Sequence, residues 1–119
     1  MIRIKRAYKE AEDTDGYRVL VDRLWPRGVS KEKEHLDLWL KEIAPSNELR
    51  KWFNHEPDKF SQFKEKYLIE LNAGEANDAC QRLIQIINKH PIVTLVYGAK
   101  DEVHNNAVVL QEMLEKVNQ

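Results

Sequence analysis

Two nearly uninterrupted apolar runs constrain the fold of this chain more than any other feature of its sequence. Residues 19–21 are Val-Leu-Val, and residues 92–97 are Ile-Val-Thr-Leu-Val-Tyr. Runs this rich in β-branched side chains are typical of strands that are covered on both faces, as in the parallel sheets of α/β proteins. We therefore expect a sheet buried between layers of helices.

Two further segments have the pattern of strands. At the N-terminus Ile2 and Ile4 alternate with basic residues, which predicts a short strand with one buried face. Over residues 36–40, Leu36, Leu38 and Leu40 alternate with Asp and Trp, and we interpret this segment as a strand too. A helix is the alternative there, because the apolar positions 36, 39, 40 and 43 also fit helical spacing.

Helical periodicity dominates the second half of the chain. Apolar residues recur at three- and four-residue steps over residues 58–71 and again over 76–87, and Gly74 is expected to end the first of these helices. Ser30 and Ser46 are typical N-caps of two shorter helices. The last helix is expected to direct four side chains inward, those of Ala107, Leu110, Leu114 and Val117.

The length of 119 residues fits one domain, residues 1–119, because single domains most often have about 100–150 residues. A hydrophobic content of 42% is typical of a globular chain. The order of the elements predicts the α/β class: a single three-layer domain with a short, mostly parallel sheet of about four strands flanked by helices.

Charge and targeting signals limit the partners and the location. The 19 basic and 20 acidic residues give a net charge of −1, which argues against a general binder of nucleic acid. No apolar run approaches the roughly 20 residues that cross a bilayer, and the N-terminus has no apolar signal-peptide core. The single cysteine, Cys80, excludes an intrachain disulfide. We expect a cytoplasmic protein with no membrane partner, and the oligomeric state is open.

Ligands of parallel sheets bind beyond the carboxyl ends of the strands, so the segments that follow the two apolar runs are the candidate site. The first segment presents Arg23, Trp25 and Arg27. Guanidinium groups suit carboxylate or phosphate ligands, and an indole can stack on a flat group. The alternative is that the arginines pair with acidic residues and that Trp25 fills the core beneath the loop.

The segment after residue 97 is the second half of the expected site. A turn at Gly98 leads to the start of the last helix, where free backbone N–H groups favour an anion. Alternatively, Asp101 or Asn105 only caps that helix, and Lys100 is a solvent-exposed charge. We expect His104, Asp101 and Lys100 to be the catalytic residues of any reaction. The ligand-binding candidates in this segment are Tyr97, Gly98 and Asn105.

Other residues carry weaker signals. Ser46 and Arg50 could form another wall of the same cleft, with a capped helix that packs its aromatic residues as the alternative. The chain has no P-loop and no dinucleotide-binding glycine motif. Its histidines lack the short helical spacing of zinc ligands. We therefore expect no metal site and can name no cofactor.

Three motifs resemble one known family. They are DGYRVLVDRLWPRG at residues 15–28, LDLWLKEIAPS at 36–46, and VTLVYGAKD at 93–101 with HNNA at 104–107. Together they look like the YeaO-like branch of the domain-of-unknown-function 488 family, over nearly the whole chain. The resemblance implies a small α/β fold and favours a strand at residues 36–40. It implies no reaction.

The combined expectation is a protein that binds an anionic or phosphorylated small molecule between the two segments. In an enzyme, His104 would be the acid or base, Arg23 and Arg27 would stabilise negative charge, and Asp101 would orient His104 or Lys100. The alternative function is a protein- or nucleic-acid-binding module that uses exposed Trp25, Trp39 and Trp52 with nearby arginine side chains.

Overall fold

The strands form one parallel sheet. In the computed structural model, which describes residues 1–117, four strands pair in the order β1-β4-β2-β3. They are β1 (Ile2–Arg6), β2 (Tyr17–Leu20), β3 (Leu38–Trp39) and β4 (Val93–Tyr97), and all their pairings are parallel. The strand predicted over residues 36–40 is therefore confirmed, although only two of its residues pair, and the predicted α/β class is confirmed with it.

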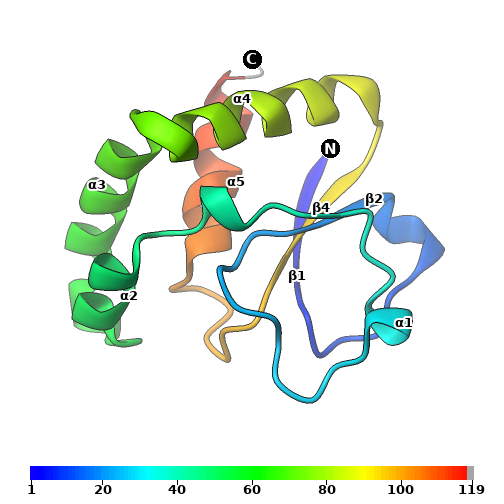
Figure 1. Cartoon of the computed structure of the whole chain (residues 1–119), viewed down its shortest axis with the longest axis horizontal. Coiled ribbons are helices and arrows are strands. Elements are labelled where there is room, and N and C mark those ends of the chain that lie inside the picture. The colour runs from blue at the N-terminus through cyan, green and yellow to red at the C-terminus, as the bar shows by residue number, and fades with distance from the viewer. Residues whose placement is uncertain (118–119) are drawn as a thin grey trace.

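Helices and short turns of 3-10 helix connect the strands (Figure 1). The predicted caps are confirmed, because the Ser30 and Ser46 hydroxyl oxygens accept hydrogen bonds from backbone N–H groups of the helices that follow them. The α-helices are α1 (Lys31–Glu34), α2 (Asn47–Phe53), α3 (Phe60–Leu71), α4 (Gly74–Lys89) and α5 (Asn106–Val117); the 3-10 turns are η1 (Asp13–Asp15), η2 (Lys41–Ile43) and η3 (Pro57–Lys59).

Two predicted details of the helices are wrong. Helix α3 ends at Leu71, and Gly74 begins α4 instead of ending α3. Its φ of +58°, which glycine adopts without strain, lets the chain turn between the two helices. Val117 is 56% exposed, so the packed part of α5 ends at the buried Leu114, one turn before the helix does.

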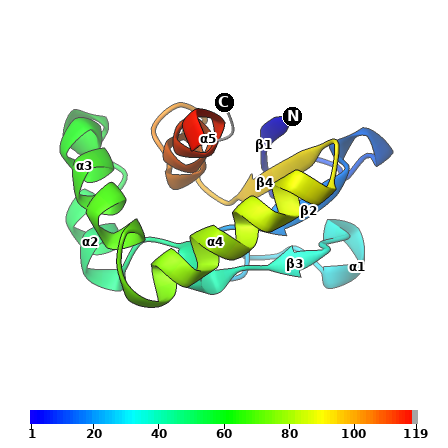
Figure 2. The ribbon, with the colours of Figure 1, turned by 90° about the horizontal axis from the view of Figure 1, so that it is seen from above.

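The two faces of the sheet are covered unequally (Figure 2). Side chains such as Val19 and Leu95 point to one face and share a single apolar cluster with residues of α3, α4 and α5. The opposite face has a much smaller apolar cluster, in which Trp25 and Trp39 pack over Leu20 and its neighbours. Helix α1 lies on this side, so the third layer of the domain is thin.

The opposite face also buries charged side chains that sequence analysis did not single out. Arg18 of β2 is 3% exposed, and its guanidinium group donates to Asp15 Oδ2 at 2.6 Å and to Glu34 Oε1 at 2.8 Å. Lys5 Nζ lies 3.1 Å from the Asp15 carboxylate. Burial raises the pKa of Glu34, and Arg18 offsets part of that effect. This network, defined by Lys5, Asp15, Arg18 and Glu34, holds η1 and α1 against the sheet.

The carboxyl ends of the strands lie at one edge of the parallel sheet, and those of β1 and β4 point to the lower edge of the domain in Figure 1. The loops that leave β2 and β4 meet at this edge. Within residues 1–117, no helix is long and apolar enough to cross a membrane.

Candidate functional site

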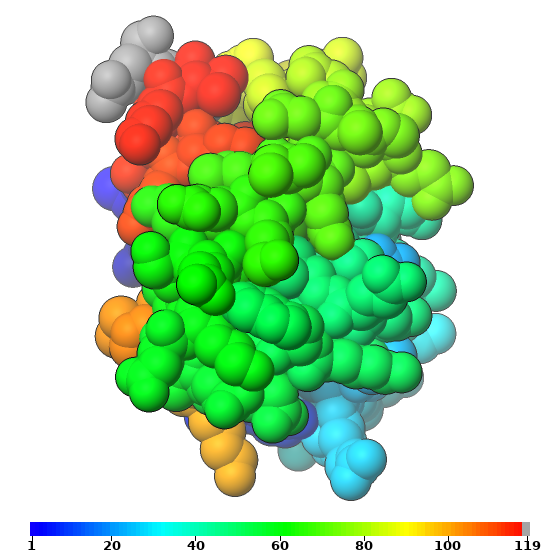
Figure 3. All heavy atoms as spheres, turned by 90° about the vertical axis from the view of Figure 1, so that its left-hand side faces the viewer, coloured from blue at the N-terminus to red at the C-terminus, as the bar shows by residue number. Residues whose placement is uncertain are grey.

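A cavity of about 660 Å³ opens beyond the carboxyl ends of β2 and β4. The loop after β2 and the turn after β4 both line it, so the two segments singled out in the sequence share one space. In Figure 3 they project, in light blue and orange, on either side of a hollow at the lower edge. The volume lies within the roughly 300–1,000 Å³ that is common for small-molecule sites.

The loop after β2 forms the first wall. Gly28 adopts a φ of +79°, a conformation that favours glycine, and the buried Pro26 fixes the chain before it. Trp25 Nε1 donates a hydrogen bond of 2.7 Å to the Val29 carbonyl, which closes the loop on itself. This wall is therefore a compact turn, and Trp25 is held by its own backbone.

The two arginines of this wall differ in freedom. The half-buried Arg23 donates to the carbonyl oxygens of Ala44 at 3.2 Å and Pro45 at 3.4 Å, so it ties the loop to the segment before α2. Arg27 is exposed at the cavity rim. Arg27 is thus available to a ligand, whereas two N–H groups of Arg23 are already hydrogen-bonded to the backbone.

Asp22, which sequence analysis did not single out as a site residue, also lines the cavity. Its Oδ2 accepts the Gly98 N–H at 2.8 Å, and its Oδ1 accepts Asn106 Nδ2 at 3.2 Å. Burial raises the pKa of Asp22, and these two donors offset part of the rise. Asp22 therefore joins the ends of β2 and β4 to the start of α5.

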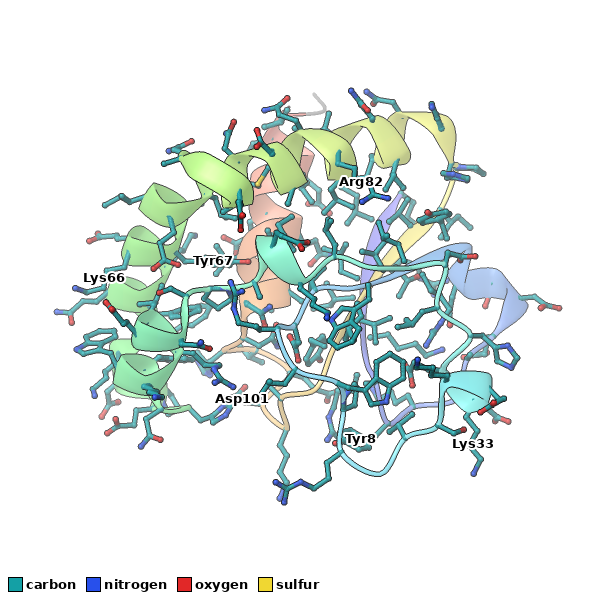
Figure 4. All side chains as sticks on the ribbon, viewed as in Figure 1. Tyr8, Lys33, Lys66, Tyr67, Arg82 and Asp101 are labelled. Carbon is teal, nitrogen blue, oxygen red and sulfur yellow. The ribbon has the colours of Figure 1, made fainter. Side chains whose placement is uncertain are left out.

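Asp101 organises the turn after β4 (Figure 4). Its Oδ1 accepts the backbone N–H groups of Val103 and His104, both at 2.9 Å, and its Oδ2 lies 2.9 Å from His104 Nδ1. These donors, chiefly the His104 N–H, lower the pKa of Asp101 to about 2. The imidazole also packs edge-on against Phe60, with ring centroids 5.2 Å apart. His104 is therefore fixed at the cavity in one orientation.

Several backbone N–H groups that were expected to attract an anion are bonded within the chain. Asn105 Oδ1 accepts the Val108 N–H at 3.0 Å and caps α5, which is one of the alternatives left open by the sequence. The Gly98 N–H donates to Asp22, and the N–H groups of Val103 and His104 donate to Asp101. Any anion specificity of this cavity therefore depends mainly on side chains.

The end of α2 contributes a third wall. Arg50, suggested by the sequence, lines the cavity together with His55. Asn54 and His55 both adopt left-handed φ angles, +48° and +55°, which turn the chain so that His55 reaches the cavity. Asn54 takes this conformation as the C-cap of α2, where asparagine is tolerated next after glycine, whereas it is less common for histidine, and sequence analysis did not single out the pair.

The inner surface of this third wall is aromatic. Phe53 and Phe63 line the cavity, and their rings stack with centroids 4.4 Å apart. Ser46, the other residue suggested for this wall, lies outside the lining: its hydroxyl caps α2 and donates to Glu70 Oε2 at 2.6 Å.

Positive charge exceeds negative charge around the cavity. Four permanently cationic side chains line it, against two carboxylates that already accept hydrogen bonds from the chain. Within the part of the chain that the structure describes, none of the four cations forms an ion pair with a carboxylate. They are Arg23, Arg27, Arg50 and Lys100.

Tyr97 and Trp39 lie outside the cavity, although sequence analysis assigned Tyr97 to the ligand site and considered the tryptophans as a docking surface. Tyr97 is 2% exposed, packs in the main core and does not line the cavity, and burial raises the pKa of its phenol. Trp39 Nε1 donates to the Asp22 carbonyl at 2.8 Å, and its ring meets Trp25 edge-on at 5.4 Å. Trp25 and Trp39 therefore cover the sheet together, and only Trp25 touches the cavity.

Metal and thiol chemistry find no support at the described residues. Among residues 1–117, no group of three or more His, Cys, Asp or Glu side chains is arranged to hold a metal ion. Cys80 is buried, and burial raises the pKa of its thiol to about 11, so the thiol is protonated at neutral pH.

Comparisons with known proteins agree over the full length of the chain. The family model described as "Inactive DUF488-N3 subclade" matches residues 1–119. The uncharacterized protein YeaO of Escherichia coli is 48% identical over 116 residues, which cover 98% of each chain. The uncharacterized proteins Rv3073c of Mycobacterium tuberculosis and Mb3100c of Mycobacterium bovis are each 35% identical over 113 residues, 95% of this chain and 92% of theirs. No solved structure matches.

Proposed function

The chain belongs to the DUF488 family, as one of its YeaO-like members, and on that premise we propose that its cavity binds an anionic, phosphorylated small molecule. The observation that carries this proposal is the convergence of Arg27, Arg50 and Lys100 on one cavity from three separate segments. Guanidinium groups bind phosphate through paired, charge-assisted hydrogen bonds, and an ammonium group adds a compact charge.

The arrangement favours a small ligand over a polyanion. The cations surround one cavity, while the net charge of the chain is −1 and Lys9 at the surface pairs with Glu102 at 2.7 Å. A nucleic-acid backbone requires a broad positive surface, whereas a single phosphate group requires only a few converging cations. The indole N–H groups of Trp25 and Trp39 are bonded to backbone carbonyls, which disfavours the alternative of a tryptophan-based docking surface.

The Asp101–His104 pair favours a second candidate, acid–base catalysis on the bound ligand. A carboxylate that holds one imidazole nitrogen leaves the other able to transfer a proton. The family description, with its word "inactive", favours binding without turnover. Incubation with sugar phosphates, followed by phosphorus NMR, separates the two: phosphate release that is lost in His104→Ala would establish catalysis.

The binding proposal is tested by titrating the ¹⁵N-labelled protein with inorganic phosphate and then with ribose 5-phosphate. We expect saturable amide shifts in residues 22–28 and 98–105, and at least about a tenfold loss of affinity in Arg50→Ala, since one charge-assisted hydrogen bond contributes roughly 1.5–3 kcal/mol. Arg82→Ala is the matched control, because Arg82 is exposed on α4, away from the cavity (Figure 4). Shifts that do not saturate, or equal losses in both variants, would refute the proposal.

A further inference from the structure

The carboxyl group of Asp22 limits which part of a ligand can lie next to it in the cavity. It lines the cavity, it is half-buried where Arg27, Arg50 and Lys100 are exposed, and among residues 1–117 it forms no ion pair. A carboxylate repels a phosphate group, so the phosphate is expected at the rim, where Arg27 and Lys100 are exposed. The part of the ligand next to Asp22 must then be neutral or positive. It must also donate hydrogen bonds, because a buried carboxyl group that loses water without gaining donors is destabilised.

Asp22 still has free acceptor capacity. A carboxylate has about four lone-pair sites. Each oxygen of Asp22 accepts one hydrogen bond from the chain, Oδ2 from the Gly98 N–H and Oδ1 from Asn106 Nδ2. These two bonds fix the orientation of the carboxyl group and leave both oxygens able to accept from a ligand.

The apolar part of the cavity lining favours a flat, weakly hydrated group over an ammonium ion. Phe53 and Phe63 are buried and stacked at 4.4 Å, and Ala44 and Pro45 are buried beside the same cavity. Moving an ammonium ion from water to such walls is costly, whereas an aromatic heterocycle loses little and packs against the rings. Neutral ring N–H groups can still donate to Asp22.

We propose that the cavity selects nucleotides, with the N–H edge of the base donating to Asp22 and the phosphate bound at the cationic rim. This inference rests on the proposed function and adds the ligand class to it. The cavity volume of about 660 Å³ suits a ligand of nucleoside monophosphate size.

Three ligands that share a phosphate group test this inference on the unaltered protein by calorimetry. GMP carries N–H donors on its base, purine riboside 5′-monophosphate has the same ring system without them, and ribose 5-phosphate has no base. We expect GMP to bind at least about tenfold more tightly than purine riboside 5′-monophosphate, because hydrogen bonds to a charged acceptor are lost in the latter. Ribose 5-phosphate is expected to bind most weakly.

The variant Asp22→Asn should reduce the difference between GMP and purine riboside 5′-monophosphate to less than about threefold, because its amide presents a donor to the base edge. Asp78→Asn, an exposed carboxamide substitution on α4, is the matched control and should keep the full difference. If Asp22→Asn does not fold, as judged by circular dichroism, the ligand series on the unaltered protein decides alone.

The outcomes separate the two proposals. Equal affinities for all three phosphate esters would overturn nucleotide selection and leave phosphate binding intact. No binding of any of them would overturn both. A preference for GMP that persists in a folded Asp22→Asn variant would overturn the role given to Asp22.

Discussion

Two clusters of charged residues, one on the thinly covered face of the sheet and one beyond the carboxyl ends of its strands, use their charges differently. In the network of Lys5, Asp15, Arg18 and Glu34, every cation has a carboxylate partner within 3.1 Å. In the cavity, Arg27, Arg50 and Lys100 have none among the described residues, and the carboxylates there accept from uncharged amides or, for Asp101, also from His104.

The difference distinguishes charges that build the fold from charges left for a ligand. Arg18 is buried and each of its three guanidinium nitrogens donates a hydrogen bond, so its removal would leave the buried Glu34 carboxylate without an ion-pair partner and Asp15 with Lys5 alone. Arg50 is exposed, and its one side-chain hydrogen bond goes to the neighbouring Asn47 at 3.3 Å. Stability should depend on the first cluster and ligand affinity on the second.

The largest expected effect is on stability. Arg18→Ala should lower the free energy of unfolding by about 3–5 kcal/mol, because it breaks a buried ion-pair network. Arg82→Ala, on the exposed side of α4, should change it by less than about 0.5 kcal/mol. Urea denaturation measures both. A loss below about 1 kcal/mol in Arg18→Ala would show that the network contributes little to folding.

The second effect is on affinity. The double variant Arg27→Ala/Arg50→Ala should bind ribose 5-phosphate between about ten and a hundred times more weakly, with losses of roughly 1.4 kcal/mol per tenfold step. Its free energy of unfolding should stay within about 1 kcal/mol of the native value, since both side chains are exposed. Calorimetry measures the affinity, and urea denaturation measures the free energy of unfolding. A stability loss as large as that of Arg18→Ala would erase the distinction between the clusters.

A smaller effect is expected from salt. Raising sodium chloride from about 0.05 M to about 0.5 M should weaken phosphate binding several-fold, because exposed charges are screened. The buried Arg18 network should respond much less, which denaturation at both salt concentrations would reveal. Phosphate affinity that is independent of salt would argue against binding by the exposed cations.

The smallest effect is a local response to acid. The folded-state pKa of Asp101, about 2, lies below its ordinary value of 3.8, so its contribution to the turn is complete above about pH 4 and is lost as the pH falls toward 2. The amide signals of Val103 and His104 should shift over this range in NMR spectra. In Asp101→Asn they should not titrate there, and an unchanged titration would assign the effect to another group.

The sheet could be predicted because its signals are local. Residues 19–21 and 92–97 are apolar enough to define buried strands on their own, and the parallel arrangement then places their following loops at one edge. Leu36 to Leu40 was ambiguous because two periodicities fit it, and pairing with β2 at Val19 and Leu20 decides the question.

The cavity could be predicted only in part, because much of it depends on contacts between distant residues. Asp22 is one polar residue at the end of a strand, and only the Gly98 N–H and Asn106 bring its carboxyl group into the site. His55 enters through two left-handed residues after α2, a conformation that its residue type does not predict. Arg18 likewise meets Glu34 across sixteen positions of sequence.

The succession of Asn54 and His55 also has a consequence for protein engineering. Glycine would relieve the left-handed strain of roughly 1–2 kcal/mol at residue 55. A redesign that seeks only thermostability would therefore consider this histidine together with His35, which also has a left-handed φ, and at residue 55 it would remove a cavity-lining imidazole. In this small domain, a substitution that attracts a stability screen can thus fall on the surface that a ligand would meet.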